Sequence, residues 1–324
     1  MHAWLCENPI GVDALSWKEL PTPAPKAGEV LIEIKAASLN FPDLLIVQNK
    51  YQMKPPLPFV PGSEYAGVVQ AVGEGVKHLT VGQHVACLSG TGGFATHTIA
   101  PAALCMPLPP GFAFVDAAAF IMIYATSHHA LLDRAQLKAG ETVLVLGAAG
   151  GVGTAAIQIA KAAGARVIAA ASTDEKCALC IAIGADATIN YSTENLRDAI
   201  KALTGGKGPD VIYDPVGGDY TEPAFRSIAW RGRYLVVGYA SGPTPSLPLN
   251  LPLLKCASIV GVFWGGFAKA EPKANAAMMG ELASWYAQGK IKPVIDSILP
   301  MVELKTAYAH MGSRGVKGKL VMVN

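Results

Sequence analysis

The chain has 324 residues, of which 51% are hydrophobic and 15% are charged, and its formal net charge is +2. This length suffices for two domains with sizeable cores, and the composition is that of a globular rather than a disordered protein. Lysines and arginines form no run or stripe, so the charge pattern gives no reason to expect nucleic acid or an anionic membrane as a partner. A function on small molecules is expected.

The N-terminal residues show no basic segment followed by an apolar stretch, so no secretory signal is predicted and a cytoplasmic location is expected. No charged residue occurs between Glu141 and Lys161, which on length alone is compatible with a membrane span. The stretch changes at its glycines from a β-type to a helical period, and we therefore expect no membrane span.

The six cysteines are scattered through the chain and are expected to be buried, reduced thiols. Cys177 and Cys180 form the only close pair, in an apparently helical run from Asp174 to Ile183. Redox pairs usually lie at the start of a helix, so no redox or metal role is expected for this pair.

In chain order, residues 29 to about 85 predict a β-rich domain, because apolar and polar residues alternate between turns rich in proline and glycine. From about Phe120 to Phe263 strands alternate with helices. The expected strands are 141–147, 166–172, 187–190, 211–217, 233–239 and 258–263, and the expected helices are 154–164, 174–184 and 194–205. This alternation predicts a parallel sheet with both faces covered. The remaining tail predicts one amphipathic helix, 276–290, and a closing strand, 319–324.

The segment VLVLGAAGGVGTAAIQIAK, residues 143–161, predicts a strand, a tight turn and a helix. Ala148, Gly150 and Gly153 occupy the three positions of the dinucleotide fingerprint G-x-G-x-x-G, with alanine in the first. The backbone can approach a pyrophosphate there, and the helix that opens with Gly151 and Val152 directs its positive end at the phosphates. We therefore predict a dinucleotide site; the alternative is a structural glycine-rich turn.

The choice of dinucleotide depends on the end of the second strand. An NAD site usually has a carboxylate there, but this chain has Ala171, followed by Ser172, Thr173 and Lys176. Two hydroxyls and a lysine can bind a 2′-phosphate through charge-assisted hydrogen bonds. NADPH is favoured over NADH, unless Lys176 is only a solvated charge on a helix face.

The chain resembles the medium-chain dehydrogenase/reductase superfamily, in particular its zinc-free quinone oxidoreductase (zeta-crystallin-like) branch. The similarity covers nearly the whole length and depends on these segments, in order: ASLNFPDLLI (37–46), PLPFVPGSEYAGVVQAVGEGV (56–76), VGQHVACLSGTGGFATHTIA (81–100), GAAGGVGTAAIQIAKAAGARVIA (147–169), VIYDPVGG (211–218) and GYASG (238–242). The resemblance implies an α/β fold. It has a GroES-like β-barrel domain from residues 1–119 and 265–324 and a Rossmann domain, residues 120–264, with a doubly wound parallel six-stranded sheet.

The resemblance also allows the zinc ligands of alcohol dehydrogenases to be compared with this chain residue by residue. Asn40 and Ser63 stand where zinc-dependent alcohol dehydrogenases have a cysteine and a histidine ligand, and neither is a good zinc ligand. The cysteine-rich loop that binds structural zinc in those relatives is missing, since Cys87 stands alone. The adjacent His128 and His129 point in different directions on a helix. We expect no metal site.

Without a Lewis acid, hydride transfer suits acceptors that already delocalise negative charge, such as quinones and α,β-unsaturated carbonyls. The implied catalytic residues are Asn40, Tyr51 and Thr126. Asn40 can donate a hydrogen bond to a substrate oxygen or cap the following turn, and Tyr51 can donate a proton or only pack. Thr126, beside Tyr124, matches a nicotinamide contact or is simply buried, and Asp43 is expected to orient its loop.

The resemblance implies further cofactor contacts at Tyr191, at Gly238, Tyr239 and Ser241 after the fifth strand, and at Phe263 and Trp264 after the sixth. The aromatic pair can instead belong to a dimer interface, because this edge strand pairs between subunits in many relatives. A homodimer is therefore expected. Lys317 lies in the tail segment that the family returns to the active site.

Three functions remain. The first is an NADPH-dependent, metal-independent reductase of quinones or enones. The second is a 2-enoyl-thioester reductase or an enzyme like an alcohol dehydrogenase, and the third is a non-catalytic NADPH-binding protein of the crystallin or scaffold type. No basic cluster for a CoA tail is visible in the linear sequence, and the weak charge argues against an RNA-binding scaffold.

Overall fold

The computed structural model describes all 324 residues, which divide into two compact units. The first unit contains Met1–Met122 and Ile295–Asn324, and the second contains Ile123–Val294. The second change of unit lies at Ile295, whereas the sequence led us to expect it at residue 265. The intervening segment packs with the second unit, where Glu281 accepts a hydrogen bond from the His128 ring (3.0 Å) and the Lys292 N–H donates to Gln158 (2.8 Å).

The first unit is built on a β-sheet with the order β14-β15-β3-β4-β5-β7, in which β6 also pairs with β3. These strands are β3 (Glu29–Leu39), β4 (Glu64–Val72), β5 (His84–Leu88), β6 (His97–Pro101), β7 (Cys105–Pro107), β14 (Ile295–Pro300) and β15 (Lys319–Val323). A separate hairpin joins β1 (His2–Leu5) to β2 (Ser16–Glu19). The unit's helices are α1 (Phe41–Val47), α2 (Phe114–Ala118) and α11 (Leu304–Gly312).

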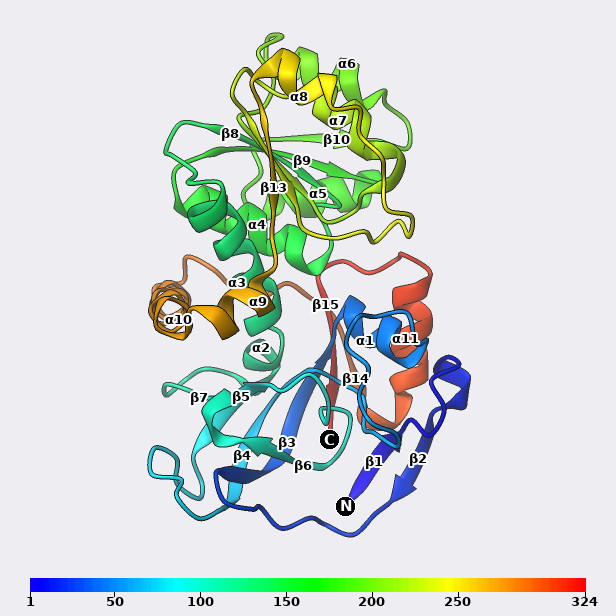
Figure 1. Cartoon of the computed structure of the whole chain (residues 1–324), viewed down its shortest axis with the longest axis vertical. Helices are drawn as coiled ribbons and strands as arrows, with labels where there is room; N and C mark the ends of the chain where they lie inside the picture. Colours follow the sequence, from blue (N-terminus) through cyan, green and yellow to red (C-terminus); the bar gives the residue numbers. More distant parts are fainter. The chain divides into compact units, whose positions relative to one another are not determined.

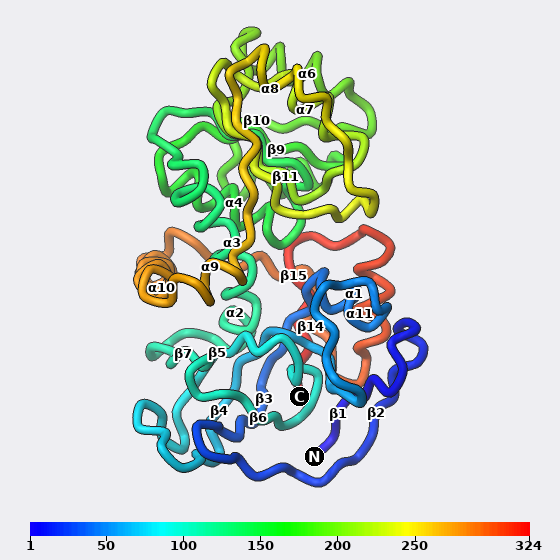
Figure 2. The backbone as a smooth tube through the Cα atoms, in the orientation of Figure 1, coloured from blue at the N-terminus to red at the C-terminus, as the bar shows by residue number.

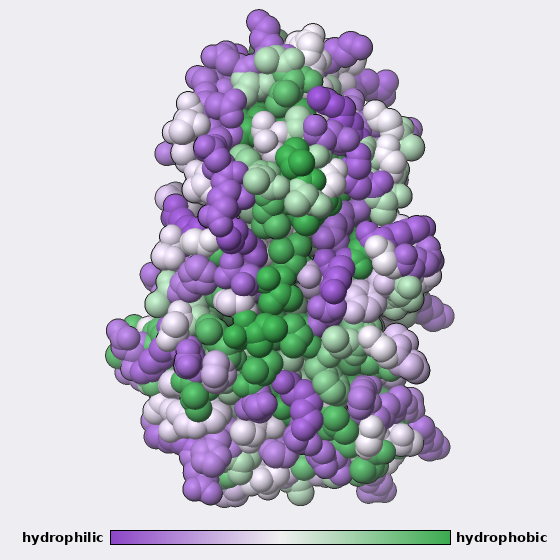
Figure 3. Space-filling view, turned by 180° about the vertical axis from the view of Figure 1, so that it is seen from behind, coloured by the Kyte–Doolittle hydropathy of each residue, from purple (hydrophilic) through white to green (hydrophobic).

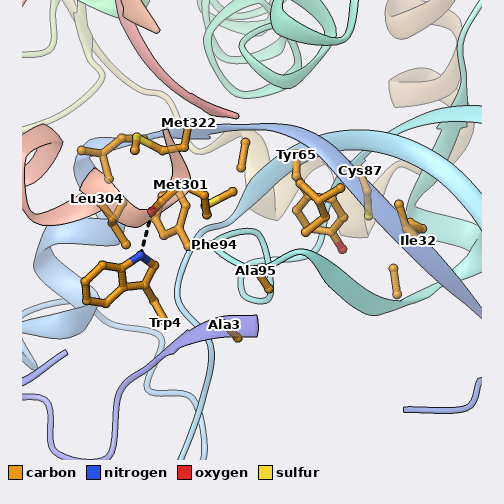
Figure 4. Close-up of a cluster of buried hydrophobic side chains, with 14 of the residues drawn as sticks. Ala3, Trp4, Ile32, Tyr65, Cys87, Phe94, Ala95, Met301, Leu304 and Met322 are labelled. Carbon is orange, nitrogen blue, oxygen red and sulfur yellow. Dashed lines mark hydrogen bonds between the residues drawn. The ribbon is translucent and has the colours of Figure 1, made fainter. Parts of the chain in front are cut away.

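The two ends of the chain meet in this sheet. β15 pairs antiparallel with β3, so the red and blue segments lie side by side in Figures 1 and 2. Alternate residues of β3, such as Val30, Ile32 and Ile34, are buried, which gives the strand one core face. In the core drawn in Figure 4, the Trp4 indole N–H donates to the Met301 carbonyl (2.8 Å). The β-rich domain thus requires the C-terminal tail to close its core.

The second unit contains six parallel strands in the order β10-β9-β8-β11-β12-β13. They are β8 (Thr142–Leu146), β9 (Arg166–Ala171), β10 (Ala187–Asn190), β11 (Val211–Asp214), β12 (Arg233–Val236) and β13 (Ser258–Gly261). The chain starts in the middle with β8, runs outward to β10 and returns to β11. The strand order therefore reverses between β8 and β11, where open α/β sheets bind ligands at the carboxyl ends of their strands. The predicted doubly wound fold is confirmed.

Helices lie against both faces of this sheet (Figure 1). The helices of the second unit are α3 (Ile121–His128), which begins at the end of the first unit, α4 (Gly151–Ala162), α5 (Asp174–Ala182), α6 (Leu196–Leu203), α7 (Thr221–Arg226), α8 (Asn250–Lys255), α9 (Trp264–Ala270) and α10 (Pro272–Ala287). Of these, α4, α5, α6 and α7 pack on the strands of the sheet. All the strands and helices expected between residues 141 and 263 are present. The short helices α7 and α8 are not among the expected elements, because each has too few residues for a helical period to be recognised.

The tail contains more structure than its sequence indicates. Besides the expected helix α10 and strand β15, it forms β14 and α11. β14 has no alternation of buried and exposed residues, and it is a strand because it pairs in parallel with β15. Its strand character is therefore decided by its partner, which local propensity does not predict.

No helix in the chain combines the length and apolar character that crossing a membrane requires. On the face drawn in Figure 3, both hydrophobic (green) and hydrophilic (purple) residues are exposed. The apolar stretch between Glu141 and Lys161 is divided into β8 and α4, as the change of period predicts.

Candidate active site

The glycine-rich turn of the second unit joins β8 to α4. Gly147 has a φ of +56°, and a Cβ there would lie 2.7 Å from a methyl carbon of Val216. A Cβ on Gly153 would lie 2.5 Å from the Gly147 carbonyl oxygen and 2.6 Å from that of Ala148. Only glycine allows α4 to begin so close to the end of β8. The third glycine of the fingerprint thus serves close packing, as the motif requires.

The N-terminus of α4 is open to an anion. Gly150 is the residue before the helix, and no side chain caps it. The N–H groups of the first turn, from Gly151, Val152 and Gly153, have no acceptor within the helix, and the helix dipole places partial positive charge there. A Cβ on Gly150 would meet only the Gly147 oxygen, at 3.4 Å, so the space in front of this residue is free of other protein atoms within 4 Å. These residues fit the pyrophosphate of a dinucleotide.

The end of β9 and the two residues after it, Ser172 and Thr173, carry no carboxylate. Asp174, the first acid after the strand, accepts a hydrogen bond from the Asn190 amide (2.7 Å) at the end of β10. Thr173 caps α5, its hydroxyl accepting the N–H of Lys176 (3.2 Å). The Thr173 hydroxyl proton and the half-buried Ser172 remain as hydrogen-bond donors beside the lysine. The loop thus has the donors that a 2′-phosphate needs.

Tyr191 lies at the same edge of the sheet. Its N–H donates to the Ala171 carbonyl (3.1 Å), which places it next to the β9 end, and its ring packs on Tyr220 with 4.5 Å between centroids. Ser172 is held to the same loop, since its carbonyl accepts the Ser192 hydroxyl (2.8 Å). The structure therefore brings together four expected residues: Ser172, Thr173, Lys176 and Tyr191.

A buried aspartate organises the turn after β11. Asp214 accepts the N–H groups of Val216 (2.7 Å) and Gly217 (2.8 Å) and the hydroxyls of Thr221 and Tyr234. This residue is not among those expected from the sequence, although an acid directly after an apolar strand is a signal for such a turn.

The expected residues Gly238, Tyr239 and Ser241 lie beside that turn. The Gly238 N–H donates to the Asp214 carbonyl (3.3 Å), and the Ser241 N–H donates to the Val216 carbonyl (2.9 Å). Gly217 has a φ of +68° and leaves room for the Tyr239 ring, because a Cβ on Gly217 would lie 2.9 Å from a carbon of that ring. The carboxyl ends of β11 and β12 are thus joined into one surface at the point where the strand order reverses.

Helix α3 holds Thr126 near the N-terminus of α4. The hydroxyl of its neighbour Ser127 bonds to the Val152 carbonyl (3.0 Å) and to the Tyr213 hydroxyl (2.9 Å). Tyr124 is buried, and its hydroxyl donates to Gln158 (2.8 Å). Thr126 itself is half-buried. Tyr124 thus has the packing role considered as an alternative.

The two aromatic side chains after β13 have different environments. Trp264 is buried, and its indole N–H donates to the Asn275 side chain (2.9 Å) on α10. Phe263 is 73% exposed. The structure therefore gives Trp264 a packing contact within the second unit and leaves Phe263 as the exposed member of the pair.

The first unit contains a buried polar cluster, which we define as Ser38, Asn40, Asp43, Glu64 and Lys319. Asn40 precedes α1, and Asp43 accepts the N–H groups of Asn40 (2.8 Å) and of Ser63 (3.0 Å). Asp43 is 1% exposed, and burial raises the pKa of its carboxyl group to about 6, against the lowering effect of these hydrogen bonds. It fixes the loop, as expected.

Glu64 and Lys319 fix the Asn40 amide. The amide nitrogen donates to Glu64 Oε2 (2.9 Å), and the Lys319 ammonium group donates to the amide oxygen and lies 3.5 Å from the same carboxylate oxygen. Glu64 also accepts the Ser38 hydroxyl (3.0 Å) and the Met122 N–H (3.0 Å). Because a cation faces its oxygen and an anion its nitrogen, the amide has one orientation.

Glu64 and Lys319 are not among the residues expected from the sequence. Both are almost fully buried, at 0% and 3% exposure. Burial lowers the pKa of Lys319, and the charges of Glu64 and Asp43 raise it. The sequence signal that could have identified them is a charged residue at the start of an apolar strand, β4 for Glu64 and β15 for Lys319. Lys317, which the family resemblance suggested, donates its backbone N–H to Asp296 (3.1 Å).

Tyr51 packs against the apolar core of the first unit and is half-buried. Burial raises the pKa of its phenol, and the charge of Asp43 raises it further. The hydroxyl therefore keeps its proton at neutral pH and is available as a donor. The Tyr51 ring can therefore pack on the core while its hydroxyl acts as a donor, so the two expected roles are compatible.

The polar cluster does not fit zinc. The chain has no group of three or more His, Cys, Asp or Glu side chains that could hold a metal ion. Asn40 and Ser63 are poor ligands, and the Lys319 ammonium group already provides a positive charge beside Asn40 and Glu64. As expected, His128 and His129 point to different partners, Glu281 and Asp133.

Five of the six cysteines are buried and all are free thiols. The exception to the expectation is Cys256, which is exposed because it ends α8 in a left-handed conformation at the surface, with a φ of +46°. Cys177 and Cys180 lie within α5, as expected.

Comparisons with known proteins cover both units. Residues 26–110 match the family model described as "Alcohol dehydrogenase GroES-like domain", and residues 151–281 match the one described as "Zinc-binding dehydrogenase". The chain is 36% identical to "Quinone oxidoreductase-like protein 2 homolog" of Nematostella vectensis, over 99% of this chain and 88% of that protein. It is 35% identical to "Quinone oxidoreductase" of Rattus norvegicus, over 94% and 92%.

Among solved structures, a quinone oxidoreductase of Escherichia coli complexed with NADPH is similar over 100% of this chain and 99% of that chain. The TM-score is 0.89 and the sequence identity is 30%.

Proposed function

Because the chain belongs to the quinone oxidoreductase branch of the medium-chain dehydrogenase/reductase superfamily, we propose that it transfers a hydride from NADPH to quinones or α,β-unsaturated carbonyls without a metal ion. The observation that carries this proposal is the buried polar cluster. Its donors are hydrogen-bonded and oriented around Asn40, and the Lys319 ammonium group contacts the amide of this residue, which by the family resemblance stands in place of a zinc ligand.

NADPH, when bound, supplies the hydride. The first-turn N–H groups of α4 receive its pyrophosphate, and Ser172, Thr173 and Lys176 bind its 2′-phosphate through charge-assisted hydrogen bonds. Tyr191, Gly238, Tyr239, Ser241 and Phe263 complete the nucleotide surface. The complex of the Escherichia coli relative with NADPH supports this assignment.

Asn40 donates a hydrogen bond to the oxygen of the acceptor. Its amide nitrogen has two hydrogens, and Glu64 accepts one of them, so one remains. The positive charge of Lys319 is transmitted through the amide oxygen and makes that remaining hydrogen a stronger donor. Negative charge develops on the acceptor oxygen during hydride transfer, and a fixed donor stabilises it without reorganisation.

Tyr51 is the proposed proton donor, and Thr126 positions the nicotinamide end. Tyr51 keeps its proton because burial and Asp43 raise the pKa of its phenol. A quinone or enone needs a proton after hydride arrives, whereas an isolated alcohol would need a base. Both carboxylates of the cluster are already engaged, Glu64 by Ser38, Asn40 and Lys319 and Asp43 by the N–H groups of Asn40 and Ser63, so neither is free to act as that base. This favours conjugated acceptors over alcohols.

The proposal is tested by following NADPH absorbance with 9,10-phenanthrenequinone, 1,4-benzoquinone, a simple enone and an enoyl thioester. We expect oxidation of NADPH with a quinone or the enone, unchanged after EDTA treatment. Binding of NADPH without turnover would favour the crystallin or scaffold type of function, and a preference for the thioester would favour the enoyl reductase. Activity that EDTA abolishes and zinc restores would contradict the metal-independent mechanism.

We further propose that two copies of the chain pair along β13, the edge strand of the second unit. Its residues Ser258, Ile259 and Gly261 are exposed, and the exposed Phe263 follows them. The Arg134 side chain donates to the Gly261 carbonyl (3.2 Å), and no other strand pairs with this side of β13. An edge strand with apolar side chains is a template for another strand. Light scattering should show a dimer, and Ile259→Lys should yield monomers with the same circular dichroism; a wild-type monomer would refute the pairing.

A further inference from the structure

Two cysteines face each other across neighbouring strands of the first unit. Cys87 on β5 is the direct partner of Cys105 on β7, and Val85 is the partner of Pro107. The Leu108 N–H donates to the His84 carbonyl (2.9 Å), which makes His84 and Leu108 a hydrogen-bonded pair. In an antiparallel ladder, hydrogen-bonded and non-hydrogen-bonded pairs alternate along the strands.

This alternation makes Cys87 and Cys105 a pair that does not exchange backbone hydrogen bonds. At such positions the Cα atoms are about 4.5 Å apart and the side chains are closer than at hydrogen-bonded positions. Disulfides form between residues whose Cα atoms are about 4.4–6.8 Å apart. The backbone therefore already satisfies the distance for a cross-strand disulfide, near the short end of the range.

The Cys105 thiol donates a hydrogen bond to the Pro101 carbonyl (3.6 Å). The Cys105 sulfur and the Tyr65 and Ser89 hydroxyls lie within hydrogen-bond reach of the Cys87 sulfur. Tyr65 is the partner of Cys87 on β4, so the three side chains share one face of the sheet; Figure 4 shows Tyr65 and Cys87 side by side. These donors lower the pKa of Cys87, whereas the same thiol contact and burial raise that of Cys105. Cys87 is thus the nucleophile of the pair.

The position of β7 provides access for a small oxidant. β7 has three residues and is the last strand in its sheet order, so no further strand covers it on that side. Short edge strands open locally at low free-energy cost. Met106 is half-buried and Pro107 is exposed. When β7 moves, an uncharged molecule the size of hydrogen peroxide can reach the buried Cys87, which lies opposite Cys105 on the neighbouring strand.

We propose that Cys87 and Cys105 are a redox-active dithiol, which hydroperoxides convert into a cross-strand disulfide between β5 and β7. The Cys87 thiolate attacks the peroxide: an S–O bond forms, the O–O bond breaks, and the leaving alkoxide or hydroxide takes up a proton. The Cys105 sulfur then attacks the Cys87 sulfenic acid, the S–S bond forms, and water leaves with the Cys105 proton. The protein loses two electrons and two protons, and the peroxide is reduced to an alcohol, or water, plus water.

The other cysteines lack this arrangement. Cys177 and Cys180 lie on one helix, and burial raises the pKa of both thiols, that of Cys180 to about 12. Burial also raises the pKa of Cys6. Cys256 is exposed but has no cysteine beside it on its strand or helix. The dithiol should therefore be the site that reacts with peroxide to form an intramolecular disulfide.

The test uses the full-length chain carrying Cys256→Ser, which removes the exposed thiol and with it disulfides between molecules. After hydrogen peroxide treatment, free thiols are alkylated in denaturant and the chain is mapped by mass spectrometry. We expect two thiols to disappear, a peptide cross-linked through Cys87 and Cys105, and full reversal by dithiothreitol. The matched control Cys177→Ser/Cys180→Ser should lose the same two thiols.

Cys105→Ala, on the short edge strand, should retain the wild-type circular dichroism and form no cross-link, and Cys87→Ala should behave in the same way. Because mapping of the Cys256→Ser chain decides the question directly, a variant that fails to fold does not prevent the test. A cross-link between Cys177 and Cys180, sulfinic acid without a cross-link, or retention of all five thiols would each overturn the proposal.

Discussion

The glycine-rich turn of the second unit and the polar cluster of the first unit are built in opposite ways. The turn works by omitting side chains, since Gly147 and Gly153 leave space for the backbone and for the start of α4. The cluster works by burying charged side chains, since Glu64 and Lys319 orient an amide between them. One site is therefore local in the sequence, and the other is assembled from distant segments. This contrast predicts different responses to substitution.

The largest loss of function is expected at Gly153. Gly153→Val places a side chain 2.5 Å from the Gly147 oxygen, so it should lower the free energy of unfolding by about 3 kcal/mol and remove NADPH binding. Gly150→Val is the matched variant, because its Cβ meets only one atom at 3.4 Å. It should lower NADPH affinity at least about tenfold and stability by about 1 kcal/mol or less. Fluorescence titration and thermal unfolding measure the two effects. Equal stability loss in both variants would contradict the separate roles.

Lys319→Met should show whether the cluster depends on charge pairing. It leaves the Glu64 carboxylate buried without its cation, which should cost about 3–5 kcal/mol in the free energy of unfolding. The double variant Lys319→Met/Glu64→Gln should recover most of the stability, as measured by urea unfolding. The double variant should remain slow in quinone reduction, because the cation beside Asn40 is missing. Recovery of the rate would show that Lys319 only compensates Glu64.

Asn40→Ala tests the proposed donor directly. Removing one fixed hydrogen-bond donor to a developing oxyanion should lower kcat about 100-fold, with the KM for NADPH unchanged. Steady-state kinetics with 9,10-phenanthrenequinone measure both constants. The capping box of α1 loses its Asn40 side chain, so unfolding must be recorded as a control. A wild-type kcat in a folded variant would remove Asn40 from the mechanism.

Asp43 should make the stability of the first unit depend on pH. Its pKa in the folded chain is about 6, above the value near 3.8 for an exposed carboxyl group, so the folded chain binds more protons between these values. Stability contributed by this group therefore falls as the pH rises from about 4 to about 6, by up to about 3 kcal/mol. The difference in unfolding free energy between the wild type and Asp43→Asn should show this slope. A difference that is constant across the window would contradict the raised pKa.

The smallest effect is expected at Lys176, on the surface of the nucleotide site. Lys176→Glu should raise the KM for NADPH about tenfold or more and change that for NADH little, because only NADPH has the 2′-phosphate. Lys201→Glu, an exposed charge reversal on α6, is the matched control and should change neither constant. Equal increases for both cofactors would show that Lys176 does not select the phosphate.

The two regions also differ in how far the sequence predicts them. The turn is predicted in detail because all its functional parts lie between Gly147 and Gly153, and its conformation follows from the glycines themselves. The surrounding β8–α4–β9 unit is likewise recognised from periodicity. At the end of β9, the absence of an acid is visible in the sequence. The hydrogen bond between Asp174 and Asn190 requires the register of β9 and β10.

The sequence alone determined the doubly wound sheet, the glycine-rich turn and the poor fit of Asn40 and Ser63 to zinc, because these depend on residue types at fixed local spacing. Tertiary structure decided that Lys319 reaches Asn40, that Trp264 packs on α10 and that Cys87 faces Cys105. Each of these contacts joins segments whose separation along the chain carries no pattern. The pairing of β15 with β3 brings Lys319 to Asn40, the pairing of β7 with β5 brings Cys105 to Cys87, and only the folded sheet fixes that register.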